Sequence, residues 1–100
     1  MALTHWAFLY TAAGTEPSGT RTDLDTGSCR TVLVGVPEAS DAVDIARSLA
    51  AEGVQLIELC GGFGPVWAAR IIDATGGAVP VGTVGYGPES VDAVHAIFTT

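Results

Sequence analysis

Apolar residues occur along the chain in short blocks separated by polar or glycine-rich stretches. Residues 30–36 and 78–84 are valine-rich runs, and residues 54–59 are almost continuously apolar. Such runs are typical of strands in a sheet that is covered on both faces. Residues 4–12 are rich in aromatic side chains and predict a further strand at the start of the chain.

Helical patterns follow the three later strands. Ser40 is suited to cap a helix that extends to about Ala51 and ends at Gly53. Pro65 and Pro88 are suited to the first turns of two further helices. The residues expected to face the core are Ile45 and Leu49 in the first helix, Ala68, Ile71, Ile72 and Thr75 in the second, and Val91, Val94 and Phe98 in the third.

This order predicts one α/β domain over residues 1–100, with a four-stranded mixed sheet and three helices. Helical crossovers join the second, third and fourth strands, which should therefore be parallel and connected with a right hand. The polar residues 13–28 are expected to be a loop.

The direction of the first strand depends on that loop. A simple return would make the strand antiparallel to the second, and His5 would then lie near the carboxyl ends of the parallel strands. A loop that crosses the sheet would make the strand parallel and would itself lie over that edge. We favour the antiparallel arrangement.

Composition and charge limit the possible functions. The chain is 48% hydrophobic and only 15% charged, which leaves more apolar surface than a small core can bury and predicts a homodimer. A net charge of −7 argues against nucleic-acid binding. The chain has no lysine, which excludes Schiff-base chemistry and a P-loop. No apolar run is long enough to span a membrane.

The two cysteines, Cys29 and Cys60, form no disulfide framework and predict a cytoplasmic protein with reduced thiols. Neither cysteine has metal-ligand spacing with His5 or His95, so no metal site is expected. The glycine-rich stretch after residue 60 does not fit a dinucleotide-binding motif, and no cofactor is expected.

Two similar turns mark the candidate ligand site. Residues 62–65 and 85–88 both read Gly-aromatic-Gly-Pro, and each joins a strand to a helix. Ligands of open parallel sheets bind beyond the carboxyl ends of the strands, where free N–H groups at helix N-termini favour an anion. The predicted ligand-binding residues are Gly61, Gly62, Phe63, Gly64, Thr83, Gly85, Tyr86 and Gly87. Alternatively, the glycines only form short turns.

Three residues are candidates for catalysis. Glu58 lies near the end of an apolar strand, where burial would raise its pKa and suit it to acid–base catalysis. The alternative is a structural carboxylate paired with Arg30 or Arg70. Cys60 lies close to a helix N-terminus and could be a nucleophile, or simply a small buried residue. His5 could pair with Cys60 only if the first strand is antiparallel.

Two resemblances rest on the same region. The segment GVQLIELCGGFGPVWAARI followed by VPVGTV resembles a family of short bacterial proteins of unknown function, most specifically in ELCGGFGP. That resemblance implies a free-standing small protein. AVDIARSLAAEGVQLIEL and VPVGTVGYGPESV look like two βα units of keto-deoxy-phosphogluconate aldolase, a (β/α)₈ barrel. This second resemblance implies an acid–base role for Glu58 alone, because the aldolase lysine has no counterpart in this chain.

The sequence therefore predicts a protein that binds a small organic anion, and that acts as an isomerase, lyase or cyclase if Glu58 transfers a proton. One alternative is a non-catalytic accessory or protein-interaction module, in which the glycine turns are only scaffolding. A second alternative is a thiol-dependent enzyme that uses Cys60.

Overall fold

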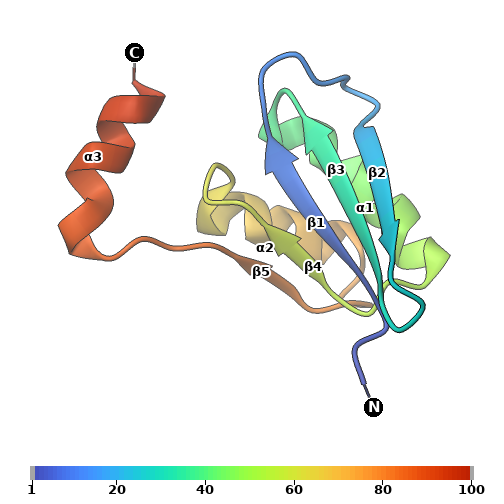
Figure 1. The fold of residues 1–100 in the computed structure, drawn as a ribbon. Helices are drawn as coiled ribbons and strands as arrows, with labels where there is room; N and C mark the ends of the chain where they lie inside the picture. The colour runs from blue at the N-terminus through green and yellow to red at the C-terminus, as the bar shows by residue number, and fades with distance from the viewer. Residues whose placement is uncertain (1, 100) are drawn as a thin grey trace.

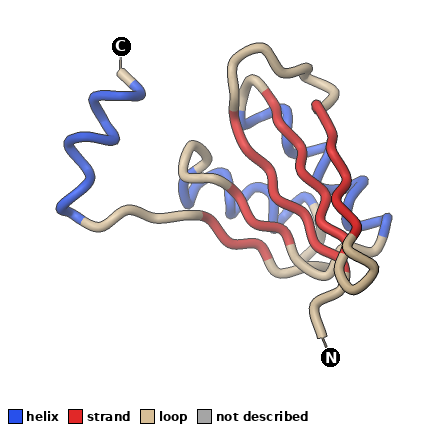
Figure 2. Tube along the Cα trace, viewed as in Figure 1, coloured by secondary structure: helices blue, strands red, loops and turns tan. Residues whose placement is uncertain are grey.

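The computed structural model describes residues 2–99 of the chain. These residues form an α/β domain with a mixed sheet and three α-helices, which confirms the predicted class (Figures 1 and 2). The elements are β1 (His5–Thr11), β2 (Thr20–Asp25), β3 (Arg30–Val36), the short 3-10 helix η1 (Ala39–Asp41), α1 (Ala42–Glu52), β4 (Ile57–Leu59), α2 (Gly64–Ala74), β5 (Val81–Thr83) and α3 (Pro88–Phe98).

The sheet has five strands in the order β2-β3-β1-β4-β5, so the prediction of four strands is wrong. The additional strand is β2, which lies inside the segment expected to be a loop. It is antiparallel to β3 at the edge of the sheet, and all six of its residues are exposed. An exposed edge strand needs no apolar alternation, which is why the sequence pattern did not reveal it.

The direction predicted for the first strand is also wrong. β1 is parallel to both β3 and β4 and lies between them. The chain leaves β1 through residues 12–19, passes the end of β3 and returns as β2 (Figure 1). A parallel β1 was the less favoured alternative. That alternative predicted that the loop would lie over the carboxyl edge of the sheet, and the loop does lie there.

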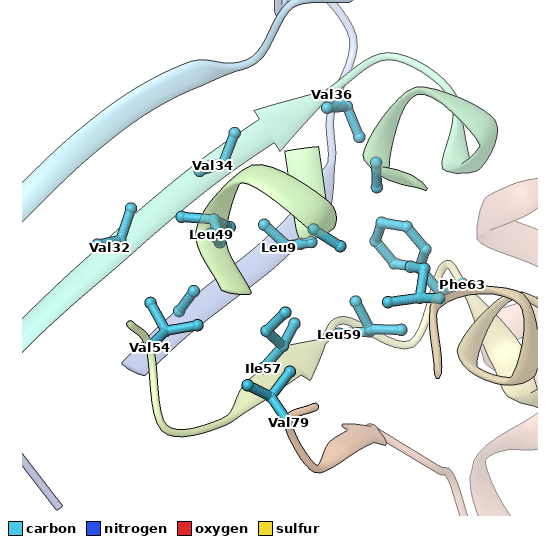
Figure 3. Close-up of a cluster of buried hydrophobic side chains, with 14 of the residues drawn as sticks. Leu9, Val32, Val34, Val36, Leu49, Val54, Ile57, Leu59, Phe63 and Val79 are labelled. Carbon is cyan, nitrogen blue, oxygen red and sulfur yellow. The ribbon is translucent and has the colours of Figure 1, made fainter. Parts of the chain in front are cut away.

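The core lies between one face of the sheet and the helices α1 and α2 (Figure 3). Alternate strand residues point into it, including Leu9, Val34 and Ile57, each at most 2% exposed. Leu49 of α1 and Ile71 of α2 meet them from the other side. Burying side chains of this size supplies the main stabilisation, at roughly 1.5–3 kcal/mol each.

The two helices that cover the core begin and end close to the predicted positions. Gly53 ends α1 in the left-handed conformation, with φ of 95°, which glycine adopts without strain. Leu49 and Ile71 are buried as predicted, but Ile72 is 39% exposed. Trp67 is half-buried against the core in its place.

Helix α3 stands apart from the rest of the domain, at the end of an extended segment that follows β5 (Figures 1 and 2). No residue of the helix is buried. Val91 is 50% exposed and Phe98 is 65% exposed, so the prediction that they face the core is wrong. The helix itself is correctly predicted, but its apolar side lies away from the chain's own core.

The second face of the sheet carries no helix (Figure 1). Trp6, Phe8 and Tyr10 alternate with the buried Ala7 and Leu9, and therefore project from this open face. No helix among the described residues combines the length and the apolar character that a membrane crossing requires.

Candidate functional site

The two Gly-aromatic-Gly segments lie side by side at the carboxyl ends of β4 and β5, which are parallel neighbours. Tyr86 of the second segment packs against Gly61, just before the first. A Cβ atom on Gly61 would come within 2.5 Å of the Tyr86 ring and 2.9 Å of its hydroxyl oxygen. Because any side chain there would collide with the ring, the close approach requires glycine.

Glu58 lies on the open face of the sheet, next to Phe8 in the register of β1 and β4. Its side chain is exposed, not buried among apolar residues as the sequence suggested. No hydrogen bond or ion pair involves its carboxylate within residues 2–99. The suggested partners are engaged elsewhere, since Arg30 contacts the ring of His5 and Arg70 lies over the Trp67 ring.

A shallow hollow of about 240 Å³ adjoins this carboxylate. It is lined by Glu58, Leu59, Gly82, Thr83 and Val84. The Thr83 hydroxyl donates a long hydrogen bond of 3.4 Å to the carbonyl oxygen of Cys60. The hollow is smaller than a typical site for a drug-sized ligand, which occupies about 300–1,000 Å³, and suits a small ligand.

Cys60 is half-buried at the end of β4 and its thiol lies beside the end of β1. The backbone N–H of Thr11 donates a hydrogen bond to Sγ of Cys60 at 3.5 Å, and the Thr11 hydroxyl lies 3.8 Å from the same sulfur. Gly62 packs closely against that hydroxyl, because a Cβ atom on Gly62 would stand only 2.5 Å from the Thr11 hydroxyl oxygen. Thr11 is a site residue that the sequence pattern did not indicate, because only the parallel β1 brings it here.

The remaining predicted ligand-binding residues divide into two groups. Phe63 is 4% exposed and belongs to the core, so its ring is not available to a ligand on the surface. Gly64 begins α2 next to the first segment. Gly85 and Gly87 lie on either side of Tyr86 in the extended segment that carries α3 away, so the N-terminus of α3 is not beside that of α2 (Figure 1).

His5 lies at the opposite edge of the sheet from Cys60. It is the first residue of β1, and β1 is parallel to β4, so His5 lies at the amino ends of the strands. Its ring contacts the guanidinium of Arg30. The pairing of His5 with Cys60 depended on an antiparallel first strand and is therefore wrong.

A larger hollow lies elsewhere, between the loop at residues 17–19 and helix α1, and has a volume of about 470 Å³. Arg21 lines it but is already engaged, donating two hydrogen bonds of 2.8 Å to Glu52 and one of 2.8 Å to Asp23. These hydrogen bonds hold the pKa of both carboxyl groups below their ordinary values. The hollow offers no unpaired cation, so we place the candidate site at Glu58.

No three histidine, cysteine or acidic side chains within residues 2–99 lie close enough together to hold a metal ion. Cys29 and Cys60 are both free thiols. The chemistry that the candidate site offers is therefore that of an unpaired carboxylate, a thiol and the hydroxyl groups of Thr11, Thr83 and Tyr86.

Comparisons with known proteins supply a family but no activity. No curated protein and no solved structure matches this chain. One family does match, over residues 4–99, which is nearly the whole sequence. The chain belongs to that family, DUF6506, which is described as a family of unknown function.

Proposed function

We propose that this protein binds a small organic acid at the carboxyl edge of β4 and β5, and that Glu58 exchanges a proton with it. The observation that carries the proposal is the position of the Glu58 carboxylate and its lack of a hydrogen-bond or ion-pair partner. The carboxylate is unpaired among the described residues and lines a hollow formed by β4, β5 and Val84, the residue before the second glycine segment.

Groups suited to hold an anion lie at the carboxyl end of the strand that carries Glu58. The N-terminus of α2 begins at Gly64, and the first N–H groups of a helix carry a partial positive charge. The Tyr86 hydroxyl adds a further donor at the same edge, and the Thr83 hydroxyl would add another by exchanging its long hydrogen bond to the carbonyl oxygen of Cys60 for one to the ligand. These donors would hold the carboxylate of the ligand and any oxyanion that develops, while Glu58 moves the proton.

Proton transfer next to a carboxylate is the chemistry of isomerases, lyases and cyclases. The choice of Glu58 also agrees with what the sequence resemblance to the aldolase implies, because that resemblance assigns an acid–base role to Glu58 alone. A general base typically contributes 10²–10⁴-fold to a rate. The free thiols Cys29 and Cys60 support a reducing, cytoplasmic setting for this activity.

The proposal is tested by binding. Thermal unfolding of the full chain is followed with acetate, pyruvate, malate and other small carboxylates, since a ligand that binds only the folded state raises the melting temperature. We expect at least one of them to raise it for the native chain, and to raise it by a different amount for Glu58→Gln, because that substitution removes a negative charge beside the ligand. Glu16→Gln is the matched control, because it removes the same charge from an exposed loop position far along the chain. Equal responses of all three proteins would exclude Glu58 from the site.

A second candidate function is that of an interaction module, which the uncovered sheet face and the isolated helix α3 favour. The thiol-dependent alternative has less support. The N–H of Thr11 that points at Sγ of Cys60 would stabilise a thiolate, but no histidine lies beside it. Alkylation of Cys60 at several pH values tests that alternative, and a thiol pKa of about 8.5 or above would argue against it.

A further inference from the structure

Two apolar surfaces of this chain have no cover among the described residues. The first is the open face of the sheet, which we define by Trp6, Phe8, Tyr10 and Leu33. The Phe8 and Tyr10 rings stack with their centroids 6.3 Å apart. Tyr10 also packs against Gly35 of β3, whose Cβ atom would come within 2.7 Å of the ring. The strands thus hold these side chains in a fixed, nearly continuous apolar layer.

The second surface is the apolar stripe of α3, formed by Val91, Val94 and Phe98. Their spacing of three and four residues places them on one side of the helix. Val91 is 50% exposed and Phe98 is 65% exposed. A helix of 11 residues is only marginally stable by itself in water, so α3 needs a surface on which to pack.

The chain's own sheet is not in a position to supply that surface. The N–H of Val84 donates to the carbonyl oxygen of Leu59 at 3.0 Å, and Tyr86 is seated against Gly61. Only Gly87 separates Tyr86 from the first residue of α3. These contacts direct the chain away from the β5 edge, and α3 lies away from the open face of its own sheet (Figure 1).

We propose that α3 packs on the open sheet face of a second copy of this chain, while the α3 helix of that copy packs on the first. One chain carries both surfaces, so a two-fold pair covers all four of them, and such self-complementary pairs are the commonest oligomers. The dimensions agree. A helix of 11 residues is about 16 Å long, and a strand of seven residues such as β1 is about 23 Å long.

The packing of α3 on the second copy also adds a wall to the candidate site. The inference about the dimer does not depend on a ligand. Glu58 is the register partner of Phe8 on the same open face. A helix from the second copy that covers Phe8 would therefore form a wall beside Glu58 and limit its access to water. A second hollow of about 370 Å³, lined by Val84, Tyr86, Val91 and Val94 among others, lies between the linker and α3 and would receive side chains of the partner.

The experiment measures the mass of the full chain in solution by light scattering after gel filtration. One chain has a mass of 10.1 kDa, and we expect a particle of twice that mass. Phe98→Asp and, separately, Val91→Asp should each weaken the dimer at least tenfold. Ala93→Asp is the matched control, since it adds the same charge to the opposite side of α3 and should leave the dimer intact. Circular dichroism of each variant confirms that the domain is folded.

A tryptophan reporter identifies the surfaces involved. In a Trp67→Phe background the remaining tryptophan is Trp6, on the open face. We expect its emission to lie further to the blue in the dimer and to move to the red on dilution or in the Phe98→Asp chain. A native chain that is monomeric, a dimer unaffected by both aspartate variants, or Trp6 emission that does not change on dissociation would each overturn the proposal.

Discussion

The ring of Tyr86 lies against the backbone of Gly61, so close that a Cβ atom on the glycine would stand 2.5 Å from it. This contact joins the end of β4 to the segment that carries α3 away from the domain. It therefore links the candidate site at Glu58 to the exposed helix.

Gly61→Ala is expected to displace Tyr86 rather than to unfold the domain, because the ring is 50% exposed and can move outward. The stability of the chain should fall by about 1 kcal/mol, and the proposed dimer should weaken as the direction of α3 becomes variable. Chemical denaturation and the dimer mass measure the two effects.

Gly85→Ala is the control for that substitution, since no atom lies within 4 Å of the position that a Cβ atom would take there. In a Tyr86→Ala background the cost of Gly61→Ala should disappear, because the two residues interact directly. If Gly61→Ala lowered the stability of the Tyr86→Ala chain as much as that of the native chain, the Tyr86 ring would not be the reason for glycine at this position.

Glu58→Gln should change the free energy of unfolding by no more than about 0.5 kcal/mol, as is usual for an exposed residue without a structural partner. Urea denaturation measures it. A loss several times larger would mean that the carboxylate stabilises the fold, and would favour the structural interpretation of this residue over the functional one.

Arg21 should make the stability of the domain depend on pH in the acid range. Its hydrogen bonds lower the pKa of Glu52 and of Asp23 from their ordinary values of 4.5 and 3.8. A lowered pKa in the folded state means that the stabilisation is present above those values and is lost as the pH falls through and below them. Melting temperatures between pH 7 and pH 2 measure this loss.

The native chain should therefore lose more stability on acidification than Arg21→Ala does. All three side chains are well exposed to solvent, so the difference should be modest and should shrink in high salt. Identical pH profiles for the two proteins would show that the network fastening β2 to α1 contributes nothing to stability.

Leu9→Ala should destabilise the domain by about 2–5 kcal/mol, since Leu9 is fully buried at the centre of the sheet. Leu3→Ala removes the same atoms from a position that is 44% exposed, and should cost less than about 1 kcal/mol. Denaturant midpoints compare them. Similar losses in the two variants would contradict the assignment of the core.

The sequence revealed those elements whose apolar residues follow a strand or helix period, including α3, whose apolar side does not face the chain's own core. The strand at residues 30–36 and the helix ending at Gly53 have clear periodicity and a clear end signal, and both appear in the structure. The exposed β2 gave no such signal, since it is held by backbone pairing with β3 and by Arg21. The direction of β1 depends on pairing between distant segments, which local patterns do not record.

The candidate site was predictable to a similar extent. The neighbouring glycine segments follow from the parallel order of β4 and β5, and they do lie together. The exposure of Glu58 could not be predicted, because it depends on a sheet face that α3 leaves open. The role of Thr11 beside Cys60 likewise required the true direction of β1.

The most direct test of the proposed site is an NMR titration of the ¹⁵N-labelled chain with the small carboxylate that gives the largest thermal shift. We expect the amide signals that move to belong to residues 58–64 and 82–86, around Glu58 and Tyr86. The proposed site would be contradicted if the signals that move belong to the hollow between Arg21 and α1, or if no carboxylate moves any signal.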